Sequence, residues 1–218
     1  MRRTKQESEQ TRQDVLAAAR RVFARRGVTR TTIGQIAVEA GVTRGAVYWH
    51  FADKTKIFHA MREQVSVPLL DRTDFELLSG ADGDALEAVE RFLRDLFDTI
   101  ANDRETRRTF QIMLLKCEYV DEFAPELPRQ IANWRTLEAK LTYAYERARR
   151  MRAMRGDLSP TLAALETCVF VSGLIRLSLL DEKRVFIRGR AHELIVAHIA
   201  SRRGIVARRT PARSRAAA

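Results

Sequence analysis

The chain has 218 residues, 45% of them hydrophobic and 31% charged, with 10 Gly and 5 Pro. This length can bury a core without metal or disulfide crosslinks, and this composition favours packed helices over sheets, collagen-like repeats or disorder. The net charge of +11 is concentrated at the two ends: residues 1–56 hold 12 Lys and Arg against 5 Asp and Glu, and residues 202–218 hold 6 Arg and no acid. Clustered positive charge favours a polyanionic partner, although a solvated basic face would have the same charge.

The first part of the chain has the pattern of four successive helices. Apolar residues recur at three- and four-residue spacing, and Gly27 and Gly41 separate the first segments. Thr32 and Gln35 have the spacing of a capping box, and Thr43 can cap the next helix. The predicted helices are 9–26, 33–40, 43–50 and 53–67, the last of them interrupted or ended by Pro68.

The rest of the chain predicts a helical bundle without β-hairpins. The predicted helices are 85–101, 104–119, 125–154, 160–180 and 187–203. The most apolar stretch, 161–180, is interrupted by Glu166 and Arg176, which favours a buried helix over a membrane span. Residues 205–218 lack apolar periodicity and are expected to form a basic, disordered tail.

Several other classes of site are not expected. The basic start of the chain lacks the apolar stretch of a signal peptide, so a cytoplasmic location without a membrane partner is expected. Cys117 and Cys168 have no metal-ligand spacing and are expected to be reduced thiols, with a redox switch between them as the alternative. No two of the four histidines have three- or four-residue helical spacing, so no metal and no cofactor is expected.

Residues 32–51, TIGQIAVEAGVTRGAVYWHF, are the most informative segment. Their apolar positions can join two short helices at a steep angle around Gly41, which predicts a helix-turn-helix. In the second helix Arg44 can read guanine, and Gly45 lets a DNA backbone approach closely. The alternative is a helical hairpin that is only part of a core.

Three large residues follow on the same short helix. Tyr48, Trp49 and His50 cannot all be buried there, and aromatic residues with polar groups beside a basic cluster suit phosphate and sugar contacts. Such contacts position a protein on DNA without reading its sequence.

The first 60 residues resemble the DNA-binding domain of the TetR family of one-component repressors, whose signature is GVTRGAVYWHF followed by Asp53-Lys54. The resemblance implies a homodimer whose recognition helices enter successive major grooves of a near-palindromic operator, about 34 to 36 Å apart. It also implies roles for eight matching positions: phosphate contacts at Thr32 and Thr43, base-side positions at Arg44 and Gly45, backbone clamps at Tyr48, His50 and Lys54, and either role at Trp49.

A second resemblance lies in the body. The stretches LLKCEYVDEF at 114–123 and SGLIR at 172–176, together with the N-terminal TKQE, resemble the multidrug-efflux-pump repressor (AcrR-like) branch. This resemblance implies repression of an efflux pump operon, a part in antibiotic resistance, and release by hydrophobic small molecules. Ser66 departs from the branch at a position where relatives can carry an acidic residue that faces cationic drugs.

A ligand pocket between the body helices would be lined by apolar and aromatic residues with a few polar groups. The four candidate walls are Phe92, Leu93 and Leu96; Phe110, Gln111, Leu114 and Leu115; Trp134, Leu137 and Leu141; and Cys168, Val171, Ser172 and Arg176. An ordinary close-packed core is the alternative, although it would not explain a buried Gln111 or Arg176.

The family resemblance places the dimer surface on the last two long helices. The expected interface residues, which form stripes that a monomer would not easily cover, are Leu174, Leu177, Ser178, Leu194, Ile195, His198 and Ile199. His198 is expected to make a hydrogen bond there rather than bind a metal.

The predicted fold is all-α, with about nine helices. A helix-turn-helix DNA-binding domain at 1–53 precedes a ligand-binding and dimerisation domain at 54–204, and the tail follows. No Walker loop, GxGxxG, GxSxG, HExxH or zinc spacing is present, so an enzyme is not expected. The alternative function is a sequence-nonspecific architectural nucleic-acid-binding protein.

Overall fold

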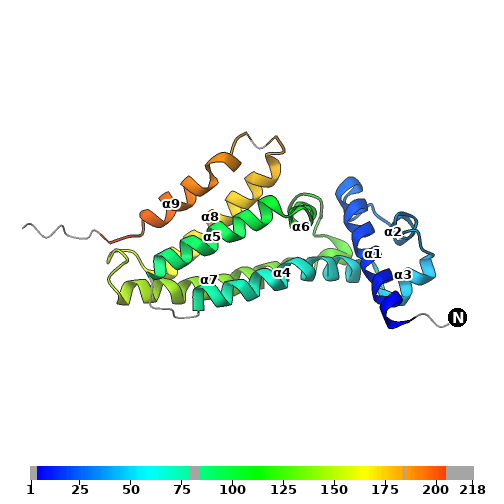
Figure 1. Ribbon diagram of the computed structural model, residues 1–218, viewed down its shortest axis with the longest axis horizontal. Helices are drawn as coiled ribbons and strands as arrows, with labels where there is room; N and C mark the ends of the chain where they lie inside the picture. Colours follow the sequence, from blue (N-terminus) through cyan, green and yellow to red (C-terminus); the bar gives the residue numbers. More distant parts are fainter. Residues whose placement is uncertain (1–3, 79–83, 184, 205–218) are drawn as a thin grey trace, which may run out of the picture.

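The computed structural model describes residues 4–78, 84–183 and 185–204. Figure 1 shows α1, α2 and α3 gathered at one end of an elongated helical body, with α4 leading from one part to the other. Within the described ranges the elements are α1 Lys5–Arg26, α2 Ile33–Ala40, α3 Arg44–His50, α4 Lys54–Leu78, α5 Ala85–Asn102, α6 Arg104–Leu115, the 3-10 helix η1 Asp121–Phe123, α7 Glu126–Arg150, α8 Pro160–Leu180, the 3-10 helix η2 Arg188–Arg190 and α9 Ala191–Ala200. The predicted all-α fold is confirmed, and the predicted tail at 205–218 lies outside the described residues.

Local hydrogen bonds fix the two short helices of the N-terminal part. The amide of Gln35 donates to Thr32 Oγ1 at 3.3 Å and the amide of Thr32 donates to Gln35 Oε1 at 3.1 Å, which confirms the capping box. Gly41 ends α2 in the left-handed conformation, with φ 69°, which a side chain would disfavour. Thr43 Oγ1 then accepts from the amide of Ala46 at 3.1 Å and starts α3.

The helices of this part share one apolar core. Val47 of α3 is fully buried against α1 and α2, beside Phe23, Ile36 and Phe58. Ile57, Phe58 and Met61, from the first half of α4, belong to the same core, as do Ile112, Met113 and Phe123 from the body. The N-terminal core therefore continues across the predicted domain limit at 53/54.

Several predicted helix ends differ from the structure, two of them at functionally relevant places. Pro68 neither interrupts nor ends the connecting helix. α4 continues to Leu78 with the proline on its exposed side, where water can solvate the carbonyl that lacks an amide partner. The helix predicted to reach residue 119 ends at Leu115. Beyond it, the Lys116 carbonyl accepts a hydrogen bond at 2.9 Å from the amide of Val28, which draws the chain toward the link between α1 and α2.

A second core lies within the body, where α5, α7, α8 and α9 pack together. Its largest fully buried side chain, Tyr145, lies with its hydroxyl 2.7 Å from Thr167 Oγ1, so the polar end has a partner. Among the described helices, α8 is long and apolar enough to cross a membrane, and half of its most apolar window is buried in this bundle.

Candidate DNA-binding surface and ligand cavity

One face of α3 is exposed. Thr43, Arg44 and Gly45 are exposed at its first turn, and Trp49 is 82% exposed in the last turn. The opposite face carries Val47, which is fully buried. The short helix is thus anchored by one side and presents the other to solvent, as a recognition helix requires. Tyr48 is also exposed, and His50 is half-buried.

Arg44 lies against the first turn of α2. A Cβ atom at Gly34 would be only 2.7 Å from Arg44 Nη2, so the missing side chain makes room for the guanidinium. The exposed guanidinium therefore lies beside Thr32, which caps the same turn. This arrangement places a possible base-reading group next to a helix N-terminus, which favours phosphate.

Ionic contacts attach α1 to the motif. Arg21 Nε lies 2.6 Å from Glu39 Oε1 on α2, and Arg25 pairs with the second oxygen of the same carboxylate. Hydrogen bonds from Arg25 and Arg21 lower the pKa of Glu39. Arg12 lies 5.2 Å from the centroid of the Phe51 ring, within range of a cation–π contact.

Lys54 does not present its ammonium group as predicted. Its Nζ donates to the Thr29 carbonyl at 3.0 Å and lies 2.8 Å from Glu122 Oε1 and 5.3 Å from the centroid of the Phe123 ring. The side chain is 11% exposed. The prediction of a backbone clamp is corrected, because these contacts use the charge to join the first turn of α4 to η1.

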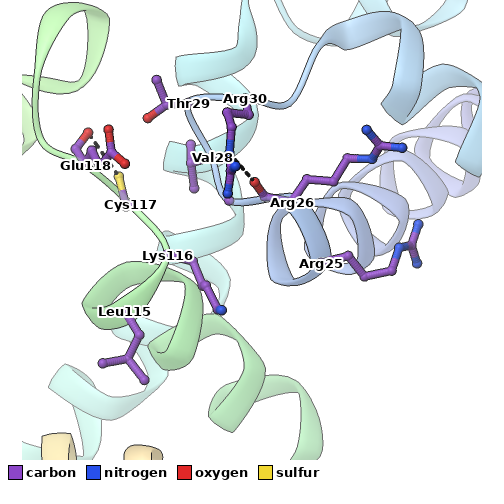
Figure 2. A pocket seen from close by; sticks show the side chains of 10 residues that line it. Arg25, Arg26, Val28, Thr29, Arg30, Leu115, Lys116, Cys117 and Glu118 are labelled. Carbon is purple, nitrogen blue, oxygen red and sulfur yellow. Dashed lines mark hydrogen bonds between the residues drawn. The ribbon is translucent and has the colours of Figure 1, made fainter.

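A polar pocket of about 230 Å³ lies near this junction, between the α1–α2 link and the end of α6. Figure 2 shows Arg25 and Arg26 projecting from the last turn of α1, and Lys116 just beyond α6. Two helix C-termini meet here, and basic residues offset the negative ends of helix dipoles. That role explains the basic lining of the pocket without a ligand.

A different cavity lies inside the body. It has a volume of about 140 Å³ and lies between α4, α5, α6, α7 and α8. Seven of the predicted pocket residues line it: Phe92, Leu96, Phe110, Leu114, Trp134, Leu137 and Ser172. The structure thus brings together side chains from four predicted walls around one largely apolar space.

Sequence reasoning missed other lining residues of this cavity. They are Leu69 of α4, Met113 of α6, Gln130 and Asn133 of α7, and Ile175 of α8; Ser66, noted only as a departure from the branch, also lines it. Gln130 and Asn133 share a helix face with Trp134 and Leu137, so their spacing could have revealed them. Leu69 lies beyond Pro68, where the sequence predicts that the helical pattern is interrupted or ends, so it was not among the predicted lining residues.

The other seven predicted pocket residues do not line this cavity. Leu93, Leu141, Cys168 and Val171 are buried in the body core, and Leu115 lines the junction pocket instead. Gln111 is half-buried outside the lining, and Arg176 is exposed and donates to the Leu114 carbonyl at 3.0 Å. For these residues the pocket assignment is corrected, because they pack in the core or meet solvent.

The predicted dimer stripe is also corrected in part. Leu174, Ser178, Ile195 and Ile199 are buried within the single chain, so they are not available to a second copy. Leu177 and Leu194 remain exposed. The error has a geometric cause: α8 and α9 have apolar residues on more than one face, and the pattern did not reveal which face packs inward.

His198 makes its contacts inside the chain. Its Nε2 lies 3.0 Å from Thr167 Oγ1, and its ring stacks on Phe170 with centroids 4.0 Å apart. Burial, and after it the charge of Arg202, lower the pKa of His198 to about 3. The imidazole is therefore neutral at neutral pH, and the predicted interface hydrogen bond is replaced by one within the protomer.

The cysteines and possible metal ligands offer no further chemistry. Cys117 and Cys168 are both free, and burial raises the pKa of each thiol, to about 12 and about 11. Thiols with such values are poor nucleophiles. Within the part of the chain that the structure describes, no group of three or more His, Cys, Asp or Glu is arranged to hold a metal ion.

A capped helix-turn-helix with an exposed recognition helix, joined by α4 to a helical body that contains an apolar cavity, defines a one-component transcriptional regulator. Comparison with known proteins identifies the family. Residues 15–61 match the model of the tetR family of bacterial regulatory proteins. The HTH-type transcriptional regulator TtgR of Pseudomonas putida is 34% identical over 180 residues, which cover 81% of this chain and 83% of TtgR. The chain belongs to the tetR family. Its relatives in this family are transcriptional regulators and not enzymes.

Solved structures agree with this assignment. NalD, the secondary repressor of the MexAB-OprM multidrug efflux pump in Pseudomonas aeruginosa, superposes with a TM-score of 0.80 at 27% identity, covering 91% of this chain and 98% of NalD. The complex of SmeT with triclosan has a TM-score of 0.77 at 26% identity and covers 90% of this chain and 93% of SmeT. SmeT is the repressor of the Stenotrophomonas maltophilia multidrug efflux pump SmeDEF.

Proposed function

We propose that this protein is a cytoplasmic repressor that binds a near-palindromic operator as a homodimer and controls a multidrug efflux pump operon. Hydrophobic small molecules release it from the operator. One observation carries the proposal: the chain has an exposed recognition helix, α3, and an apolar cavity lined in part by α4, the helix that connects the body to the N-terminal part. The relatives NalD and SmeT, both repressors of multidrug efflux pumps, support the assignment of the regulated genes.

The proposed DNA contacts are the exposed or half-exposed residues of the motif. Arg44 reads bases, with Gly45 allowing close approach, and the remaining residues contact the backbone. The backbone set is Thr32, Thr43, Tyr48, Trp49 and His50. Footprinting on the DNA that flanks the gene tests this proposal: a repressor protects one discrete palindrome at physiological salt. Equal affinity for any duplex, with a steep salt dependence, would instead favour the architectural alternative.

The proposed ligand is hydrophobic and uncharged. The described residues that line the cavity include the aromatic rings of Phe92, Phe110 and Trp134 and no ionisable side chain. Polar groups from Gln130 and Asn133 can orient a guest by hydrogen bonds. The complex of SmeT with triclosan supports this choice and provides a probe.

Tryptophan fluorescence tests the cavity directly, because the chain has only two tryptophans, Trp49 on α3 and Trp134 at the cavity. We expect triclosan to quench the fluorescence of a Trp49→Phe variant, whose remaining tryptophan is Trp134. Quenching confined to a Trp134→Phe variant would contradict binding in the cavity.

The proposed dimer surface is the outer face of α8. Its exposed apolar residues are spaced by three, four, eight and three residues and so share one face: Leu162, Leu165, Val169, Leu177 and Leu180. Leu194 and Val196 of α9 are exposed as well. We expect Val169→Glu to convert a dimer into a monomer in sedimentation or light scattering, because a charge there would be buried by the second copy.

A further inference from the structure

A carboxylate is buried where α4 meets α7. Glu126, the first residue of α7, has a side chain that is only 1% exposed. Arg62 Nη1 donates to its Oε2 at 2.8 Å, and Arg129 Nη1 donates to its Oε1 at 2.6 Å. His59 Nε2 lies 2.7 Å from Oε1, although the geometry is not that of a hydrogen bond. A carboxylate removed from water is costly unless it is paired, so these partners make the burial tolerable.

The partners of Glu126 come from two helices. Arg62 and His59 belong to α4, whereas Arg129 lies on α7 itself, one turn after the carboxylate. Arg62 Nη2 lies 3.1 Å from His59 Nδ1, and because a guanidinium only donates, the proton of a neutral His59 is on Nε2, toward Glu126. Burial lowers the pKa of His59, against the raising effect of Glu126. The pair of Arg62 with Glu126 is therefore the ionic link between the helices.

This link lies beside the cavity. Ser66 follows Arg62 by four residues on α4, and Gln130 follows Glu126 by four residues on α7, a rise of about 6 Å along each helix. Both Ser66 and Gln130 line the cavity. A ligand held between these two helices is thus one helical turn from the ionic link.

The same part of α4 also reaches the DNA-binding domain. Phe58, a residue of the N-terminal core, packs edge-to-face on Phe23 of α1 and on Phe123 of η1, with centroids 6.4 and 5.4 Å apart. Lys54, at the first turn, contacts Thr29 and Glu122. A change in the position of α4 against α7 is therefore transmitted directly to the helices that support α3.

We infer that Glu126 is the positioning residue that couples the cavity to the DNA-binding domain, an inference that rests on the proposed ligand response. The closed pair of Arg62 with Glu126 holds α4 in the orientation in which the recognition helices fit the operator. A ligand in the cavity separates α4 from α7 and weakens the pair. Because coupling between two binding sites is reciprocal, weakening the pair lowers operator affinity and raises ligand affinity.

The test compares two variants of the full-length protein, Glu126→Gln and the matched control Arg129→Gln. Arg129 contacts the same carboxylate without reaching α4. Operator affinity is measured with the footprinted duplex, and cavity affinity with triclosan as the probe. For Glu126→Gln we expect operator binding about tenfold weaker and triclosan binding to free protein tighter by a similar factor, within the usual range of coupling between sites. Arg129→Gln is expected to change neither affinity.

A merely structural role for Glu126 predicts a different pattern. Loss of folded protein would weaken binding at both sites, and tighter triclosan binding is the readout that such a loss does not produce. Equal behaviour of the two variants, or weaker operator binding with unchanged triclosan binding, would overturn the inference. If Glu126→Gln lacks the helical circular dichroism of the wild type, the same two affinities are measured for Arg62→Lys. This variant keeps the positive charge on a shorter side chain, so the same pattern is expected.

The proposed ligand response can fail separately. If triclosan does not bind the wild-type protein, that response fails for this probe, while the comparison of operator affinities still decides the role of Glu126. For variants whose helical circular dichroism and unfolding midpoint match the wild type, a tenfold difference in operator affinity between Glu126→Gln and Arg129→Gln supports the role, and equal affinities overturn it.

Discussion

The DNA-binding region and the ligand cavity are built in opposite ways. The recognition surface comes from consecutive residues of α3, whose inner side is fixed by Val47 and whose outer side carries Arg44 and Trp49. The cavity is formed by side chains from five helices that are far apart in the sequence. A local surface can be recognised from spacing alone, whereas a cavity depends on which face each helix turns toward its neighbours.

The two regions nevertheless share a mechanical connection. The N-terminal core includes residues of α4 and the body residues Ile112, Met113 and Phe123. Met113 also lines the cavity, so one side chain takes part in both regions. The difference between a local surface and an assembled cavity therefore does not make them independent units.

The largest expected effect comes from the shared core. Phe58 is buried between Phe23 and Phe123, so Phe58→Ala is expected to lower the free energy of unfolding by about 3 to 5 kcal/mol. Denaturant unfolding followed by circular dichroism measures the change. A control, Trp49→Ala, removes an exposed ring and should alter stability by less than about 0.5 kcal/mol. A Phe58→Ala variant as stable as the control would contradict the shared core.

The next effect separates base reading from general affinity. Arg44→Ala is expected to weaken operator binding by about 1 to 3 kcal/mol, because a bidentate contact to guanine is lost, while binding to a random duplex changes much less. Fluorescence anisotropy with the two duplexes measures both affinities. Arg135→Ala, which removes an exposed charge from the body, is the control and should leave the ratio of affinities unchanged. Equal losses on both duplexes would remove the base-reading role of Arg44.

A third prediction concerns the cavity alone. Trp134→Ala is expected to weaken triclosan binding by about 1 to 3 kcal/mol, because the ligand loses an apolar wall. Calorimetry measures this change, and operator affinity without ligand should stay at the wild-type value. Trp134→Phe retains an aromatic ring and should show a smaller loss. Unchanged triclosan affinity in Trp134→Ala would place the ligand elsewhere.

The smallest expected effect is a pH dependence within the body. The pKa of His198 is about 3 in the folded protein, below the usual value of about 6.5. Between these values the unfolded chain binds more protons at this residue, so its contribution favours folding above about pH 6.5 and declines as the pH falls toward 3. We expect unfolding midpoints to fall less between pH 7 and pH 5 in His198→Gln than in the wild type. An equal fall in both proteins would contradict the lowered pKa of His198 in the folded protein.

The accuracy of sequence reasoning follows the same contrast between the two regions. The capping box of Thr32, the turn at Gly41 and the exposed position of Arg44 depend on nearby residues, and spacing was sufficient to predict them. Lys54 was misassigned, because its partner Glu122 is distant in sequence and no local pattern indicates the pair.

The errors in the body have the same origin. In α8 and α9 apolar residues occur on several faces, so Ile195 was predicted to face a second copy although it is buried in the chain's own core. No local pattern distinguishes Glu126 from the other acidic residues, because its burial results from the packing of α4 against α7. These features depend on tertiary packing, which periodicity does not specify.

Release of DNA by a ligand in the cavity is the central claim, and one titration tests it most directly. A compound that quenches Trp134 in the Trp49→Phe variant is added to the complex of wild-type protein with fluorescently labelled operator, and anisotropy reports the fraction of bound DNA. We predict that anisotropy falls over the same concentrations at which the cavity fills, since tenfold release requires only about 1.4 kcal/mol of preference for the released state. Unchanged anisotropy with a filled cavity would contradict the account.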